Sequence, residues 1–268
     1  MASIDDRKLR KRGLKRLQKE RGKSIAEDIF PKLVETKGDN PIIKEELPTL
    51  FHAAHNPPGT VSHALKEAFA QYRSTLAHAH QSLLDRYTMK DAAMKVVGIG
   101  SVGTSCAVML FMAMDGDPLF LQVKEARASV LEPYAGASVF PSHGQRVVDG
   151  YRLMQPASDM FLGWSTGLEK RHFFVRQLRD IKISIRVETF GAPEMDLYAA
   201  WCGRALALSH ARSGWSAVLS GYLGRSDAFD QAIADFSVAY ADQNEKDHAA
   251  LERAVRKGTV KAIFEEER

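Results

Sequence analysis

The chain has 268 residues with a formal net charge of +4, and 45% of them are hydrophobic, 26% charged and 9% aromatic. This composition is typical of a folded protein with a substantial core and excludes disorder throughout the chain. The longest apolar run, residues 106–114, is less than half of the ~20 residues that a membrane-spanning helix needs, so no membrane span is expected.

The positive charge is concentrated at the N-terminus. Residues 1–23 contain ten basic and three acidic side chains, whereas the rest of the chain is slightly acidic. A basic segment such as residues 7–23 is suited to nucleic acid or an anionic surface. Because no aromatic residues are interleaved with it, we favour a solvated helix with a thin stripe of leucines. No apolar stretch follows the N-terminal charges, so we expect no secretory signal. Cys106 and Cys202 lack the spacing of a disulfide framework or metal site. We therefore expect a cytoplasmic protein.

The chain divides by pattern into four parts. The basic helix and a proline-broken stretch occupy residues 1–60, where short helices at most are expected. Apolar residues recur at helical spacing in residues 61–93, and residues 94–182 are β-rich with one helix. The pattern of residues 183–268 is helical, including a long helix after Gly224.

Residues 94–182 predict a small antiparallel sheet. Two apolar runs at 107–111 and 119–123 flank the turn sequence Asp115–Pro118, which indicates a β-hairpin. A helix is expected over residues 141–156, with strands after it at 161–164 and 173–178. The predicted fold class is therefore α+β: a small antiparallel sheet that carries a glycine-rich loop and packs on a mainly helical remainder.

The strongest motif is the glycine pattern G-x-G-x-x-G at Gly98, Gly100 and Gly103. Glycines at this spacing let backbone N–H groups approach phosphate oxygens. Thr104 stands where a Walker A loop needs lysine, and Ile99 stands where a lipase-type elbow needs glycine, which excludes both. A dinucleotide-binding turn, a kinase-like glycine-rich loop and a plain structural turn remain.

The first two of these interpretations predict different structures after the glycines. A dinucleotide-binding turn predicts a helix at residues 104–112 and a later acid, for which Glu125 has a tolerable spacing. A kinase-like loop lies between two antiparallel strands, with a lysine in the next strand, and Lys124 occupies that place. We therefore expect an ATP site, with Mg²⁺ as a companion ion, in which the lysine is partnered by an acid, Asp149 or Glu132. Its phosphate-binding residues would be Gly98, Gly100, Ser101, Gly103 and Lys124.

Several longer stretches resemble a known bacterial family. The matching stretches are VVGIGSVGT, DPLFLQVKEARASVLEPY, HGQRVVDGYRLMQPASDMFLGW, VRQLRD, HARSG and SDAFDQAIADFSVAYADQNEKDHAAL. They resemble the family called domain of unknown function 2252, over roughly residues 60–260, which corresponds to the C-terminal portion of that family. The family is itself distantly similar to kinase-like phosphotransferases of the aminoglycoside phosphotransferase type.

The resemblance implies carboxylate motifs that this chain lacks. Longer relatives carry G-D-x-H-x-x-N and D-F-D-type motifs upstream of the glycine loop. In this chain Gly38-Asp39 is followed by Asn-Pro and Gly116-Asp117 by Pro, so neither is followed by the His and Asn of the first motif. The sequence Asp-Phe-Asp of the second motif does not occur. The expectation is a nucleotide-binding, kinase-like module that is inactive alone and whose exposed apolar surface is covered by a missing N-terminal segment or a second copy.

Other polar groups receive simpler interpretations. His210 and Arg212 are expected at a helix end, and the pairs His52/His55 and His78/His80 lack a third ligand, so we expect surface histidines and no metal site. The alternative function is a non-catalytic scaffold or regulatory protein with a purely structural glycine turn. An NAD-binding oxidoreductase is the less favoured alternative. The acceptor substrate is not indicated.

Overall fold

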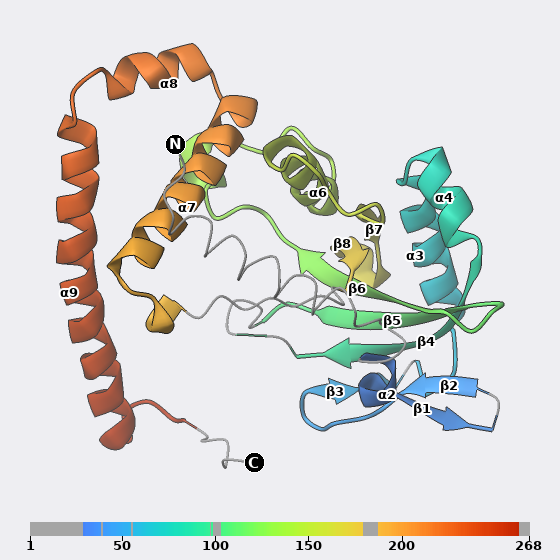
Figure 1. Ribbon diagram of the computed structural model, residues 1–268. Coiled ribbons are helices and arrows are strands. Elements are labelled where there is room, and N and C mark those ends of the chain that lie inside the picture. The colour runs from blue at the N-terminus through green and yellow to red at the C-terminus, as the bar shows by residue number, and fades with distance from the viewer. Residues whose placement is uncertain are drawn as a thin grey trace. The chain divides into compact units, whose positions relative to one another are not determined.

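The computed structural model describes residues 29–38, 40–54, 56–96, 98, 103–178 and 187–262 (Figure 1). The chain forms two compact units, residues 1–213 and 214–268. The predicted α+β class is confirmed, because antiparallel sheets and helices together make up the described chain. The basic segment of residues 7–23 lies outside the described residues.

A six-stranded sheet forms the centre of the first unit. Its strands run in the order β3–β4–β5–β6–β8–β7, and every neighbouring pair is antiparallel. The strands are β3 (Leu50–Phe51), β4 (Tyr87–Lys95), β5 (Cys106–Ala113), β6 (Pro118–Ala126), β7 (Gly163–Thr166) and β8 (His172–Gln177). A separate hairpin consists of β1 (Val34–Lys37) and β2 (Asn40–Ile43). In Figure 1, β4, β5 and β6 lie side by side in the sheet.

The expected hairpin, helix and strands of residues 94–182 are confirmed. Strands β5 and β6 are joined by a tight turn in which Gly116 has a φ of 87°, a conformation that glycine adopts without strain. Helix α6 (His143–Met154) begins after Ser142, whose hydroxyl accepts from the Gln145 N–H at 3.4 Å. Strands β7 and β8 come next, as predicted. The short helices α5 (Glu132–Ala135) and η3 (Leu168–Lys170) lie in the connections.

Two expectations for the earlier part of the chain are wrong. The helical pattern expected up to residue 93 ends earlier, because residues 87–93 form most of strand β4, after helices α3 (His63–Ser74) and α4 (His78–Leu84). Residues 34–51 contain strands β1 to β3 in place of short helices, and α2 (Phe30–Leu33) precedes them. The physical reason is that residues 87–94 form a strand by pairing with β5, a later segment of the chain, and such a pairing leaves little local signal in the strand's own sequence.

The two faces of the sheet are covered differently. One face, here called the α3 face, packs its apolar side chains against α3 and α4 around the buried ring of Tyr72. The other, here called the Lys124 face, packs against β1, β2 and α2. Helix α6 also lies on the Lys124 face, since the ring centroids of Tyr151 and Phe174 are 6.2 Å apart and Phe174 is the cross-strand partner of Lys124.

The C-terminal helices are confirmed in outline. After η4 (Val187–Thr189), helix α7 (Ala192–Ser213) closes the first unit, and both Ser209 and Arg212 donate to the Met154 carbonyl oxygen at the end of α6. The second unit contains α8 (Ser216–Leu223) and α9 (Ala228–Arg256). Gly258, with a φ of 72°, ends α9 as expected, and its N–H donates to Val255 O at 2.9 Å.

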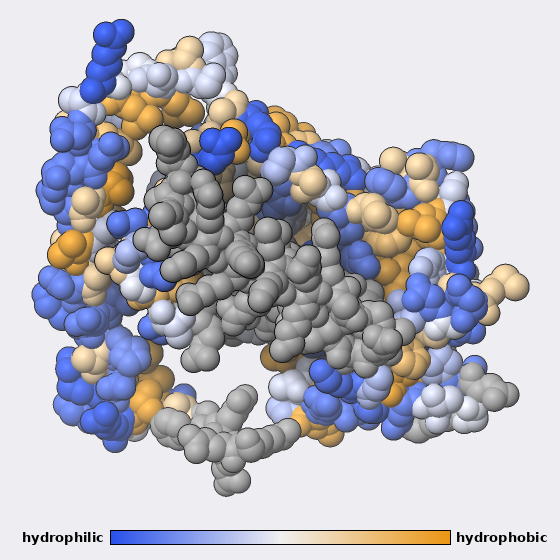
Figure 2. Space-filling model, viewed as in Figure 1, coloured by the Kyte–Doolittle hydropathy of each residue, from blue (hydrophilic) through white to orange (hydrophobic). Residues whose placement is uncertain are grey.

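The helices of the second unit expose apolar side chains. Neither α8 nor α9 has a buried residue, and orange apolar surface runs along both in Figure 2. The aromatic and aliphatic residues at helical spacing on α9 are all exposed: Phe229, Ile233, Phe236 and Tyr240. An amphipathic helix gains most of its stability by burying such a face.

Candidate functional site

The glycine-rich loop joins strands β4 and β5 of the sheet. Gly98 and Gly103 lie at its two ends, with φ values of 37° and 75°, which favour glycine. Among the described residues, no atom lies within 4 Å of a Cβ built on Gly98 or Gly103. Gly100 and Ser101 lie outside the described residues. The loop connects two antiparallel strands, and the strand at residues 106–113 replaces the helix that a dinucleotide-binding turn requires, which argues against the NAD-binding alternative.

Lys124 lies on the strand next to the one that leaves the loop. It is paired across the sheet with Cys106 on one side and Phe174 on the other. The neighbouring Val123 packs against the α3 face, so strand alternation directs Lys124 to the opposite face. Within the described part of the chain, the Lys124 ammonium forms no hydrogen bond or ion pair. A half-buried and uncommitted cation therefore lies beside the end of the glycine loop.

A polar cluster surrounds this lysine on the same face. The buried Gln122 accepts from the Arg176 guanidinium at 3.1 and 3.2 Å and donates to the Cys106 sulfur at 3.6 Å. Burial raises the pKa of the Cys106 thiol, while the positive charge of Lys124 and the hydrogen bond from Gln122 oppose that rise. Two cations, Lys124 and Arg176, thus occupy one stretch of the Lys124 face, an arrangement suited to an anionic ligand.

The two acids expected to partner Lys124 have other contacts. Asp149 forms an ion pair with Arg152 at 3.7 Å, and Arg152 in turn lies over the ring of Trp164. Glu132 accepts from the Ser129 N–H at 3.2 Å. A basic residue of α6, Arg146, contacts the chain just after β6: its guanidinium donates to the Arg127 carbonyl oxygen. The pairing of Lys124 with either acid stays a prediction.

Glu125 anchors the C-terminal end of the glycine loop. Its carboxylate, 6% exposed, accepts from the Ser105 N–H at 2.9 Å and from Arg127 at 2.8 Å, and Arg171 lies 3.7 Å away. Arg127 also donates to the Gly103 carbonyl oxygen. The hydrogen bond from Arg127, aided by that from Ser105, holds the pKa of Glu125 below its ordinary value despite burial. In the dinucleotide-binding interpretation Glu125 is the later acid of the motif, whereas in the structure its carboxylate supports the loop.

Replacing Glu125 by glutamine is expected to destabilise the fold in a pH-dependent way. The Glu125 pKa is lower in the folded than in the unfolded chain, so its stabilisation is present above the ordinary value of 4.5 and is lost as pH falls through the folded pKa. Urea unfolding should show the Glu125→Gln deficit at about pH 7 and its disappearance in acid. Glu67→Gln, at an exposed position on α3, is the control. If Glu125→Gln were destabilised equally at every pH, the role of the Glu125 carboxylate in anchoring the loop would be contradicted.

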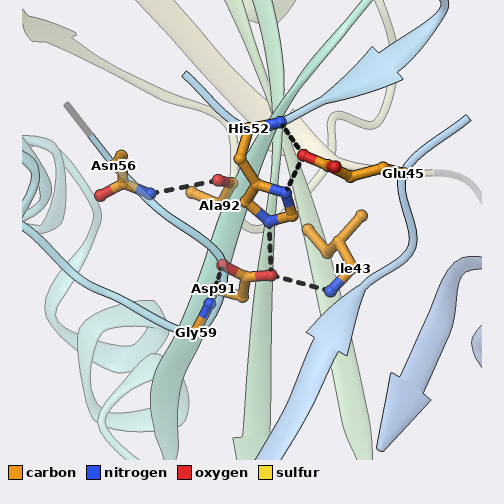
Figure 3. A network of polar contacts seen from close by, with 7 residues as sticks. All are labelled: Ile43, Glu45, His52, Asn56, Gly59, Asp91 and Ala92. Carbon is orange, nitrogen blue, oxygen red and sulfur yellow. Dashed lines mark hydrogen bonds and ion pairs between the residues drawn. The ribbon is translucent and has the colours of Figure 1, made fainter. Parts of the chain in front are cut away.

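A second polar network is buried where β2, β4 and the residues after β3 meet (Figure 3). The Asp91 carboxylate accepts from the Ile43 N–H at 2.7 Å and from the Gly59 N–H at 3.1 Å, and the His52 ring lies 2.9 Å from it. The other ring nitrogen of His52 is 2.9 Å from Glu45. The expectation of a surface histidine is therefore wrong for His52, whose side chain is 3% exposed. The network ties residues 43–59 to the sheet.

Sequence reasoning missed this network because its members are distant along the chain. One local signal existed: Asp91 interrupts a stretch of methionine and alanine in MKDAAM. Of the other histidines expected at the surface, His55 lies outside the described residues. On α4, His78 is exposed and His80 is half-buried. Among the described residues, no group of three or more His, Cys, Asp or Glu side chains is arranged to hold a metal ion.

Comparison with known proteins places the chain in one family. In its described part, no helix combines the length and apolar character needed to cross a membrane. Searches of the curated proteins and of the solved structures found no match. A family model described as "Uncharacterized protein conserved in bacteria (DUF2252)" matches residues 1–254 and so includes the first 60 residues that the resemblance left out. The chain therefore belongs to this bacterial family.

Proposed function

We propose that the protein is a nucleotide-binding, kinase-like module that binds ATP·Mg²⁺ between the glycine-rich loop and Lys124. The observation that carries the proposal is the pairing of Lys124 with Cys106, the first residue of the strand that leaves the loop. In protein kinases a glycine-rich loop covers the phosphates and a lysine on the third strand contacts them. Here the order of parts is the same: strand β4, loop, strand β5, then strand β6 with the lysine.

The helix after the lysine strand extends the likeness. In kinases a helix comes after that strand and supplies an acid to the lysine. Here α6 comes after β6 and packs on β7 and β8, and Gly144 brings the helix backbone close to strand β8. The acid of α6, Asp149, forms an ion pair with Arg152 at 3.7 Å, and in this respect the arrangement departs from that of kinases.

The proposal covers binding and leaves phosphoryl transfer to a longer protein. Transfer needs one carboxylate at the acceptor hydroxyl and others for Mg²⁺. By the resemblance, those carboxylates belong to upstream motifs that this chain lacks, so we propose that the chain represents the C-terminal portion of a kinase-like phosphotransferase and is inactive by itself. Ser101 and the glycines would cradle the phosphates, and Lys124 would neutralise them.

Calorimetric titration with ATP·Mg²⁺ tests this proposal. The folded wild type should bind saturably, and Lys124→Ala should weaken binding by about tenfold to a hundredfold, the worth of one charge-assisted contact. Lys66→Ala, which removes an exposed lysine on α3, is the matched control and should bind like the wild type. If the wild type binds no nucleotide while its circular dichroism shows it folded, the proposal fails and the scaffold alternative takes its place. Equal binding by all three proteins would reject the assignment of Lys124.

A further inference from the structure

A cavity of about 390 Å³ lies between α3 and the sheet, on the face opposite to Lys124. Its walls are almost entirely apolar: Leu65 and Phe69 come from α3, and Met109, Val123 and Val175 come from the sheet. Protein cores normally leave few voids larger than a water molecule. A space of this size is within the range of small-molecule sites.

Short side chains keep the cavity open. Alanines from three different elements line it, two on α3, two on β4 and one on β5: Ala64, Ala68, Ala92, Ala93 and Ala107. A larger aliphatic residue at any of these positions would fill part of the space.

The polar groups of the cavity come from neighbouring strands. The Ser105 hydroxyl accepts from Arg171 at 2.8 Å. Ser165 lies on β7, and Arg171 lies in the turn that joins β7 to β8. Ser165 is 5% exposed, and within the described chain its hydroxyl has no hydrogen-bond partner. The cavity therefore has an apolar body with hydroxyl and guanidinium groups in its lining.

Arg171 is not tightly paired with an acid. It lies 3.7 Å from the buried carboxylate of Glu125, which Arg127 contacts more closely at 2.8 Å. The second acid near Arg171 is Glu169, which lies 3.7 Å away and is 82% exposed. Surface ion pairs of this kind are weak, so a ligand carboxylate can replace Glu169 at little cost.

We propose that this cavity binds a medium-chain fatty acid. The alkyl chain would lie among the apolar side chains of α3 and the sheet, and the carboxylate would accept hydrogen bonds from Arg171 and Ser165. Arginine and carboxylate form charge-assisted and often bidentate pairs, which give such a site its orientation. Lys124 itself does not line this cavity, because Val123 faces it while Lys124 projects to the other face of β6.

Titration with decanoate, kept below its micelle-forming concentration, tests the proposal on the whole chain. The wild type should bind one equivalent, and decanol should bind about tenfold to a hundredfold more weakly, because it lacks the carboxylate for Arg171. Ala68→Leu should fill the cavity and abolish binding. Ala70→Leu, two residues along α3 at an exposed position, should bind like the wild type.

A second variant separates the head group from the chain. Arg171→Gln should weaken decanoate binding by about tenfold or more and leave decanol binding unchanged. No binding of decanoate by the folded wild type, or undiminished binding by Ala68→Leu, would overturn the cavity as the site. Equal affinity for decanoate and decanol would overturn the fatty acid as its ligand. Neither result depends on whether the protein binds ATP.

Discussion

Gly144→Ala is expected to lower the free energy of unfolding by about 3 kcal/mol, because helix α6 has no room for a methyl group at this position. A Cβ on residue 144 would lie 2.3 Å from the carbonyl oxygen of Phe173 and 3.1 Å from the Cβ of Trp164. The first of these atoms is backbone in a strand paired on both sides and cannot move aside. The helix would have to retreat from the sheet, and the completely buried Val148 would lose its packing.

The control is Gly150→Ala in the same helix. No atom of the described part of the chain lies within 4 Å of a Cβ at this position, so the substitution adds only helix propensity and should stabilise by roughly 0.5–1 kcal/mol. Urea unfolding of the wild type and both variants measures the two effects, which should have opposite signs. If Gly144→Ala were as stable as the wild type, the close approach of α6 to β8 would be wrong.

Asp91→Ala is the second substitution expected to have a large effect. Asp91 is fully buried, and its carboxylate is the acceptor for the backbone N–H groups of Ile43 and Gly59 and lies 2.9 Å from the ring of His52. Truncation leaves two buried donors and an imidazole without their acceptor. Breaking a buried polar network in this way typically costs about 3–5 kcal/mol. The free energy of unfolding should fall by that amount, as measured by urea titration.

Two further variants show whether the acceptor or the side-chain volume matters. Asp91→Asn keeps the shape but places an NH₂ group where one oxygen accepted, so it should remain well below the wild type in stability. Asp85→Ala removes an exposed carboxylate paired with Arg73 and should change stability little. A comparable loss for Asp85→Ala and Asp91→Ala would show that the buried network contributes no more than a surface pair.

Local patterns along the chain were sufficient for one hairpin of the sheet and for three of the helices. The Asp115–Pro118 turn between two apolar runs predicted the β5–β6 hairpin, and that hairpin brings Lys124 beside Cys106. Helical spacing predicted α6, α7 and the long helix α9, with Gly258 at its end. These signals come from residues within a few positions of one another, so they can be interpreted without knowing the fold.

Strand β4 and the environment of the site required the tertiary structure. Asp91 looks like a solvent-exposed position in the sequence, yet it is buried because it meets Ile43 and His52, which lie 48 and 39 residues away. The contacts of Glu125 with Ser105 and Arg171, and the alanines around the cavity, likewise come from separate elements. The sequence by itself determined the hairpin, the glycine pattern and the helices, because these depend on neighbouring residues. The anchoring of the loop, the buried network and the cavity were decided only by the tertiary structure, because each depends on partners that distant segments supply.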